Sequence, residues 1–145
     1  MQKGFVKEFS LYCEKKNLDV NTQQIKLIKN LEEYYKLNYK SFISKILSKK
    51  NLKKGFYLYG DVGVGKSMIL DFFFNLVKDK KLKLHFNEFM LNFHDFVHKS
   101  KDKNDENKIN KFVKKLKSKA KLIYFDEFQV TNIVDAMILG KLFDE

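Results

Sequence analysis

The sequence predicts an α/β protein in which helices cover a parallel β-sheet, preceded by an α-helical segment. Two observations predict this class. From residue 55 onward, short apolar stretches alternate with longer amphipathic ones, and alternation of strands and helices is typical of parallel sheets. Before residue 48 the apolar residues recur with helical spacing only. We therefore expect a helical segment at residues 1–50 and an α/β core at residues 51–145, separated by the polar stretch 48–55.

The N-terminal segment is expected to hold three helices. The first covers residues 4–16, and its apolar face consists of Phe5, Val6, Phe9, Tyr12 and Cys13. This face suits docking onto the domain better than lying on a membrane surface. Asn21 and Gln24 have the spacing of a capping box. A second helix should therefore run from there to about Leu37, and a third to about Leu47.

The core is expected to alternate strand and helix. The predicted strands cover residues 56–59, 82–86 and 122–125. The predicted helices cover residues 65–78, 87–100 and 109–119, with a solvated loop at 101–108. A last helix should be capped by Thr131 or Asn132 and run through Phe143.

The chain is strongly basic, with 29 lysines, 18 acidic residues and a formal net charge of +11. Charge of this kind points to nucleic acid or an acidic surface as a partner. However, the sequence has no Arg, Pro or Trp and is rich in Lys, Asn, Ile and Phe, which suggests an AT-rich coding sequence. Because much of the charge then lies on solvated faces, nucleic-acid binding is the less favoured interpretation.

The sequence also bears on location. Cys13 is the single cysteine, so an intrachain disulfide cannot form and a cytoplasmic location is expected. The apolar runs are shorter than the roughly 18 residues that a membrane span needs. The charged N-terminus lacks the apolar core of a secretory signal.

A glycine-rich stretch follows the first predicted strand. Gly60, Gly65, Lys66 and Ser67 fit the pattern G-x-x-x-x-G-K-[ST], which forms a loop that cradles nucleotide phosphates. Glycine permits backbone angles that a side chain would forbid, and amides at a helix N-terminus attract anions. We expect Lys66 to reach the β- and γ-phosphates and Ser67 to place its hydroxyl on Mg²⁺. The expected phosphate-binding residues are Gly60, Asp61, Val62, Gly63, Val64, Gly65, Lys66, Ser67 and Met68.

Two acidic residues, Asp126 and Glu127, follow the last predicted strand. Ligands of α/β proteins bind at the carboxyl ends of parallel strands. Asp126 is therefore expected to join Ser67 in holding Mg²⁺, and Glu127 to orient and deprotonate an attacking water. The sequence predicts nucleotide hydrolysis, with Lys66 and Glu127 as the catalytic residues.

The three histidines are weaker candidates for chemistry. His94 and His98 are four residues apart on one predicted helix, a spacing that can bind zinc, and His85 lies on the second predicted strand. They have no H-E-x-x-H arrangement and no cysteine nearby. Packing or surface roles are therefore favoured over a metal site.

Three stretches together resemble one family. They are similar to successive signatures of the ZapE-type cell-division ATPases. The stretches are GFYLYGDVGVGKSMILDFF, HFNEFM with two later histidines, and FDEFQVTNIVDAMILGKLF. The resemblance covers most of the chain from about Asn21. It implies an AAA+ P-loop NTPase with a three-layer parallel sheet, hydrolysis of ATP with Mg²⁺ and, in bacteria, action at the division site on the FtsZ ring. Mitochondrial relatives serve protein quality control.

The resemblance assigns the phosphate loop and the acidic pair to the residues already named. The chain departs from the family at three positions. The family usually has Thr at the position of Ser67, usually has Asp at that of Asn132, and often has His at that of Asn87. AAA+ proteins imply a homo-oligomer and an arginine finger, yet the sequence contains no Arg. In this class a strand from later in the chain separates the phosphate-loop strand from the acidic strand. Because the sequence ends at Glu145, we expect the N-terminal portion of an ATPase, without full turnover on its own.

Two alternatives stay open. The basic helix at 108–119 would be the contact surface of a helicase loader that binds nucleic acid. Its inner side, formed by Phe112, Val113 and Leu116, fits an ordinary solvated helix as well. The other alternative is a nucleotide-binding remnant that does not hydrolyse its ligand.

Overall fold

A computed structural model describes residues 4–39, 55–61, 63–101 and 103–144. The chain divides between Val77 and Lys78 into two compact units, which are described here one at a time. The helix expected up to Leu47 and most of the polar stretch at 48–55 lie outside the described residues. The expected division into residues 1–50 and 51–145 therefore stays a prediction.

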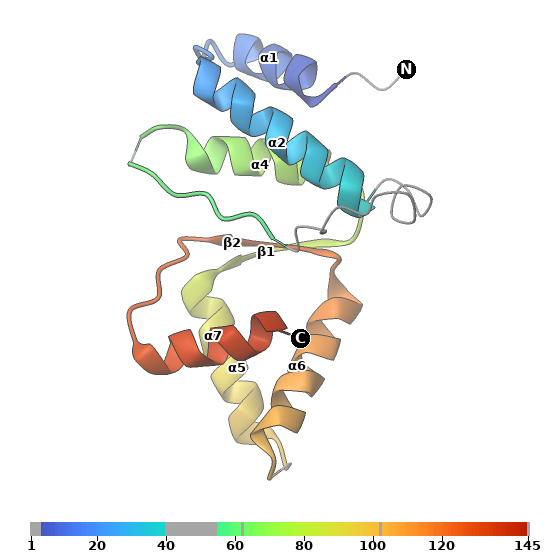
Figure 1. Ribbon diagram of the computed structural model, residues 1–145, viewed down its shortest axis with the longest axis vertical. Helices are drawn as coiled ribbons and strands as arrows, with labels where there is room; N and C mark the ends of the chain where they lie inside the picture. Colours follow the sequence, from blue (N-terminus) through green and yellow to red (C-terminus); the bar gives the residue numbers. More distant parts are fainter. Residues whose placement is uncertain (1–3, 40–54, 62, 102, 145) are drawn as a thin grey trace. The chain divides into compact units, whose positions relative to one another are not determined.

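The first unit contains three described helices, drawn from blue to green in Figure 1: α1 (Phe5–Lys15), α2 (Thr22–Tyr39) and α4 (Lys66–Leu76). The N-terminus of α2 has the predicted capping box. The Asn21 backbone N–H donates to Gln24 Oε1 at 3.2 Å, and the Gln24 N–H donates to Asn21 Oδ1 at 2.8 Å. Both bonds satisfy amides at the helix start that have no partner within the helix.

Aromatic side chains hold the three helices together. Phe72 on α4 lies 5.1 Å from Phe9 on α1, measured between ring centroids. Phe73 on α4 contacts Phe5 on α1 at 6.2 Å and Tyr34 on α2 at 6.3 Å. Such pairs add to the stabilisation that comes from burial alone. The helix that begins in the glycine-rich loop is thus anchored on both N-terminal helices.

The apolar face of α1 is buried inside this unit, with Phe9 and Cys13 both 0% exposed. Burial also raises the pKa of the Cys13 thiol. The docked helix expected from the sequence is therefore the one observed. Among the described helices, none has both the length and the apolar character needed to cross a bilayer.

The strand predicted at 56–59 does not form. These residues lie in a segment without regular secondary structure, although their side chains still alternate between partly buried and exposed. Tyr57 and Tyr59 are exposed and Phe56 and Leu58 are partly buried. A strand exists only where its backbone N–H and C=O groups pair with a neighbouring chain segment. Within the described ranges, no strand pairs with residues 56–59.

The second unit contains a two-stranded parallel sheet of β1 (Lys81–His85) and β2 (Leu122–Asp126). In the register, Lys83 lies opposite Tyr124, and His85 lies opposite Asp126. The connection from β1 to β2 contains the helices α5 (Phe86–Lys99) and α6 (Asp105–Lys119), and α7 (Ile133–Asp144) follows β2. The parallel pairing and the strand–helix alternation expected for this region are confirmed. The three-layer arrangement stays a prediction.

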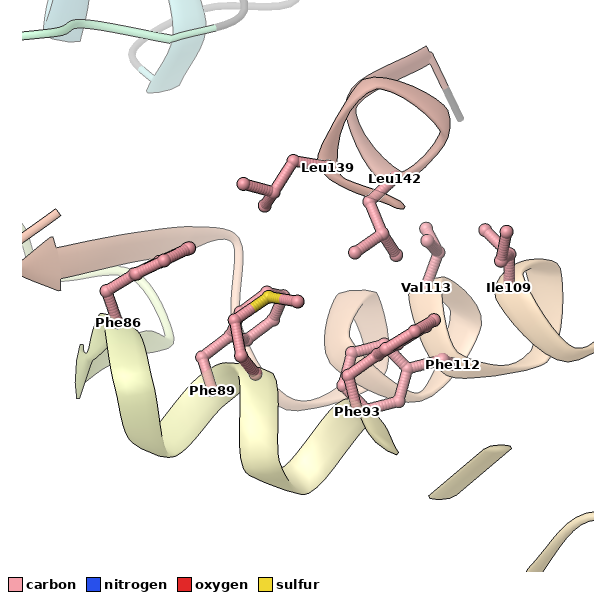
Figure 2. Close-up of a cluster of buried hydrophobic side chains, with 9 residues drawn as sticks. Phe86, Phe89, Phe93, Ile109, Phe112, Val113, Leu139 and Leu142 are labelled. Carbon is pink, nitrogen blue, oxygen red and sulfur yellow. The ribbon is translucent and has the colours of Figure 1, made fainter. Parts of the chain in front are cut away.

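Helices α5, α6 and α7 of this unit share one hydrophobic core, shown in Figure 2. It consists of Phe86, Phe89, Met90 and Phe93 from α5, Ile109, Phe112 and Val113 from α6, and Leu139 and Leu142 from α7. Phe125 at the end of β2 joins it through an edge-to-face contact of 4.7 Å with Phe89. The core therefore fixes the C-terminal end of β2, where the acidic pair lies.

Two helix starts are set by asparagine side chains. Asn104 Oδ1 accepts from the Glu106 N–H at 2.9 Å, so α6 begins at Asp105, whereas the sequence predicted a loop to residue 108. The polar first turn of α6 resembles a loop in composition, and the cap makes it helical. Asn132 Oδ1 accepts from the Val134 and Asp135 N–H groups at 2.7 and 3.1 Å. Of the two predicted caps for the last helix, Asn132 is the correct one.

Candidate functional site

The glycine-rich loop has the backbone that its sequence predicts. Gly60, Gly63 and Gly65 have φ angles of 146°, 86° and 85°. Residues with a Cβ atom rarely adopt these angles, so glycine is needed at each of the three positions. At Gly65 a Cβ atom would also lie 3.1 Å from Gln24 Nε2 on α2. The glycines therefore set both the path of the loop and its close approach to α2.

The loop leads directly into α4, whose first turn carries Lys66, Ser67 and Met68. Gly65 precedes the helix in the left-handed conformation and, as a glycine, has no side chain with which to cap this N-terminus. The first amides of a helix have no partner within it and carry partial positive charge. With a loop of this shape in front, such amides form the cradle that anions such as phosphate occupy.

Lys66 folds back over the loop. Its Nζ atom donates to the Gly60 carbonyl at 2.9 Å and also to the Asp61 carbonyl. Ser67 is exposed, and so are Asp61 and Val64 in the loop. Val62 lies outside the described residues. The ammonium group is therefore held at the loop, next to the amides that would bind phosphate.

The acidic pair lies where β2 ends. Asp126 is the last residue of the strand, and its side chain is 23% exposed. Its Oδ2 atom accepts from Lys83 Nζ at 3.2 Å, and its Oδ1 atom accepts from the Tyr124 hydroxyl at 3.3 Å. Partial burial by itself raises the pKa of Asp126. The hydrogen bond and charge of Lys83, the Tyr124 hydroxyl and the Glu127 N–H outweigh this effect and hold that pKa below the ordinary aspartate value.

Glu127 differs from its neighbour Asp126 in backbone conformation and in side-chain exposure. Its φ angle is 53°, in the left-handed region that non-glycine residues seldom adopt. The backbone therefore turns sharply after β2, and the Glu127 side chain is 79% exposed. His85 Nδ1 lies 4.0 Å from Glu127 Oε2. Backbone strain of this kind is common at functional positions, and here it occurs together with a solvent-exposed carboxylate.

The residues expected to bind magnesium carry suitable donors. Mg²⁺ prefers oxygen ligands and is usually held by one or two protein groups together with substrate phosphates and water. Ser67 offers a hydroxyl, and Asp126 a carboxylate whose lowered pKa favours the charged form. In the described part of the chain, no cluster of three or more His, Cys, Asp or Glu residues could hold a metal by itself. This donor set fits an ion that arrives with a nucleotide.

The loop belongs to the first unit and the acidic pair to the second. The structure therefore describes the two halves of the predicted site separately. The roles assigned to Lys66, Ser67, Asp126 and Glu127 remain predictions.

Within the described ranges, the histidines do not belong to any group of three or more potential metal ligands. His94 Nε2 lies 3.1 Å from Asp135 Oδ1 and so links α5 to α7. The Asn132 side-chain amide donates to the other oxygen of Asp135 at 3.3 Å. His85 contacts Glu127 as described, and His98 is exposed. His94 thus has a structural partner that sequence spacing did not reveal.

Sequence reasoning also missed Lys83 and Tyr124 as partners of Asp126. Lys83 is one of 29 lysines, and nothing in its immediate sequence marks it. The signal lies in the strand register, which places Lys83 beside Tyr124 and next to the end of β2.

Comparison with known proteins identifies the family. The family model described as AFG1-like ATPase matches residues 4–145. Lactation elevated protein 1 homolog B of Danio rerio is 40% identical over an alignment of 107 residues, with 67% of this chain and 21% of that protein covered. Cell division protein ZapE of Escherichia coli K12 is 37% identical over an alignment of 90 residues, with 61% of this chain and 24% of that protein covered. No solved structure gives a significant match.

The chain thus spans between a fifth and a quarter of the length of these two relatives. The resemblance to ZapE-type proteins that the motifs indicated is confirmed. Because the family model matches all but the first three residues, this chain belongs to the AFG1-like ATPase family.

Proposed function

We propose that this chain binds ATP together with Mg²⁺ and forms part of an enzyme that hydrolyses it. One observation carries the proposal. The loop at 60–67 combines three glycines with positive φ, a lysine folded over the loop and a helix N-terminus whose N-cap residue, Gly65, has no side chain. Each feature favours a bound phosphate group, and together they match a nucleotide cradle.

Binding would exchange the partners of Lys66. Its ammonium now donates to neutral carbonyl oxygens of Gly60 and Asp61. Hydrogen bonds from an ammonium to a charged phosphate oxygen are stronger than those to a neutral carbonyl. Lys66 would therefore turn from the loop carbonyls to the β- and γ-phosphates, which it would hold and neutralise.

The other residues would act on the metal and on water. Ser67 and Asp126 would hold Mg²⁺, which neutralises charge on the phosphates. Glu127 would orient the attacking water and accept its proton. Its exposed carboxylate, on a residue with a left-handed backbone, is suited to this task.

The test compares binding with turnover. Binding of a fluorescent ATP analogue and release of phosphate are measured for the unaltered chain, Lys66→Ala and Glu127→Gln. Lys66→Ala should weaken binding at least about tenfold, because it removes a charge-assisted contact. Glu127→Gln should leave binding intact and abolish any turnover that the unaltered chain shows. Lys78→Ala, an exposed lysine just after α4, is the control for loss of charge.

Two results would contradict the proposal. Nucleotide binding that Lys66→Ala leaves unchanged would exclude the loop as the site. Turnover unaffected by Glu127→Gln would exclude Glu127 as the base. Binding without measurable phosphate release in the unaltered chain would instead support the nucleotide-binding remnant.

The biological setting is proposed from the relatives. The name of the Escherichia coli relative assigns it to cell division. We extend that role to this chain, with a cytoplasmic location at the division site and a protein partner such as the FtsZ ring. Co-sedimentation with FtsZ polymers, with and without ATP, tests the partner. A chain that stays in the supernatant under both conditions contradicts it.

A further inference from the structure

Three side chains form a small charged cluster at the C-terminal end of the two-stranded sheet. Lys83 Nζ lies 3.2 Å from Asp126 Oδ2 and 4.9 Å from the centroid of the Tyr124 ring. The Tyr124 hydroxyl donates to the other oxygen of Asp126. Lys83 thus contacts both neighbours, and both oxygens of the carboxylate are engaged.

The sheet register brings this cluster together. Lys83 and Tyr124 are directly paired across the parallel strands, and Asp126 is two residues beyond Tyr124. Side chains two residues apart on a strand point to the same face. The arrangement therefore follows from backbone pairing within the second unit.

We propose that Lys83 is an internal counter-ion of Asp126 that Mg²⁺ must displace, so that Lys83 sets the metal affinity of this half of the site. The meaning of this competition in the enzyme rests on the proposed function. The competition itself concerns only residues of the second unit.

The physical argument is a conflict of charge at one carboxylate. Mg²⁺ binds oxygen at about 2.0–2.1 Å, and an ammonium group at hydrogen-bond distance from the same carboxylate repels it. The Lys83 side chain is 37% exposed and has a flexible four-carbon stem. Its ammonium can therefore leave for solvent when a divalent ion arrives. Tyr124 would still hold the carboxylate in place through its hydroxyl.

The competing interpretation makes the opposite prediction. If Lys83 only positions Asp126 for the metal, its removal should weaken metal binding. If Lys83 competes with the metal, its removal should strengthen binding. The sign of the change decides between the two.

The experiment uses Mn²⁺ alone as a paramagnetic probe, because carboxylate sites accept both Mg²⁺ and Mn²⁺. Broadening of the amide NMR signals of Asp126 and Glu127 is followed as Mn²⁺ is added to the full chain. In Lys83→Met we expect these signals to broaden at about three- to tenfold lower Mn²⁺ concentration, as for loss of one partly exposed charge. Mg²⁺ should reverse the broadening at correspondingly lower concentration.

Controls separate the specific contact from general charge. Lys81→Met removes a lysine two residues earlier on the same strand and should shift the broadening much less. Lys83→Arg keeps the charge and should behave like the unaltered chain. Asp126→Asn should lose the localised broadening.

Unchanged or weaker Mn²⁺ binding in Lys83→Met would overturn the inference. An equal gain in Mn²⁺ affinity in Lys81→Met would also overturn it, because the gain would then come from the electrostatic field of the whole surface. The measurement needs no nucleotide. Failure of the chain to bind ATP would therefore contradict the proposed function, whereas an unshifted Mn²⁺ titration would contradict the proposed role of Lys83.

Discussion

Asp126 shows how one carboxylate acquires its properties from its neighbours. Burial alone would favour the protonated acid, but Lys83, the Tyr124 hydroxyl and the Glu127 N–H all favour the charged form. The adjacent Glu127 has none of this enclosure and is largely exposed. Two neighbouring acids are thereby suited to different tasks, one as a fixed anion and the other as a base open to water.

The lowered pKa of Asp126 predicts a dependence of stability on acid. Because the folded pKa lies below the unfolded value, the unfolded chain binds more protons, and stability should decrease as the pH falls from about 4 through the folded pKa. The contribution is fully present above the unfolded pKa. Urea unfolding at several values between pH 5 and pH 2 measures it.

Variants assign this acid dependence to Asp126. Asp126→Asn should flatten the decrease in stability, and Tyr124→Phe should flatten it partly because one hydrogen bond is lost. An acid dependence identical in all three chains would show that other carboxylates dominate.

At the scale of elements, the backbone conformation of a segment decides how a glycine affects stability there. Gly63 in the phosphate loop and Gly140 inside α7 both have open space around the position of a Cβ atom. They differ in backbone conformation, since Gly63 has a φ of 86° and Gly140 lies in a regular helix. Steric crowding is equal at the two positions, so any difference between them must come from the backbone.

We therefore expect alanine to have opposite effects at these positions. Gly63→Ala should destabilise the first unit by about 1–2 kcal/mol, because the left-handed conformation is unfavourable for a residue with a Cβ atom. Gly140→Ala should stabilise the second unit by about 0.5–1 kcal/mol, because glycine is a poor helix former. Urea denaturation followed by circular dichroism measures both. Changes of the same sign in the two variants would refute the backbone explanation.

At the scale of the whole molecule, the dominant property is its charge of +11. Lysines with exposed side chains occur on both units, including Lys7 and Lys26 in the first and Lys114 and Lys119 in the second. A nucleic-acid site would need the charge to act from one surface, such as α6. A dispersed distribution instead predicts weak binding without a preferred surface.

We expect single-stranded DNA to bind only at low salt, with a dissociation constant weaker than about 10 μM at 150 mM salt, as for non-specific contacts. Fluorescence anisotropy with a labelled oligonucleotide at several salt concentrations measures this. Reversing the charge of Lys114 and Lys119 on α6 should weaken binding as much as reversing Lys7 and Lys26. Tight binding at 150 mM salt that only the α6 changes abolish would support the helicase-loader alternative.

Local features of this protein could be read from the sequence because they depend on residues close together in the chain. The capping box of Asn21 and Gln24, the cap at Asn132 and the glycines of the loop each follow from one residue type in its immediate backbone setting. The helices α1, α4 and α5 follow from apolar periodicity in the same way. The family resemblance depends on these same local motifs.

The tertiary structure decided what depends on pairing between distant segments. Residues 56–59 have a strand-like sequence, but strand formation requires a partner, and no described strand pairs with them. Lys83 reaches Asp126 because the register of β1 and β2 pairs Lys83 with Tyr124, two residues before Asp126 on β2. Sequence patterns report the preferences of neighbouring residues, whereas hydrogen-bonded ladders and ion pairs between strands depend on which distant segments meet and in which register.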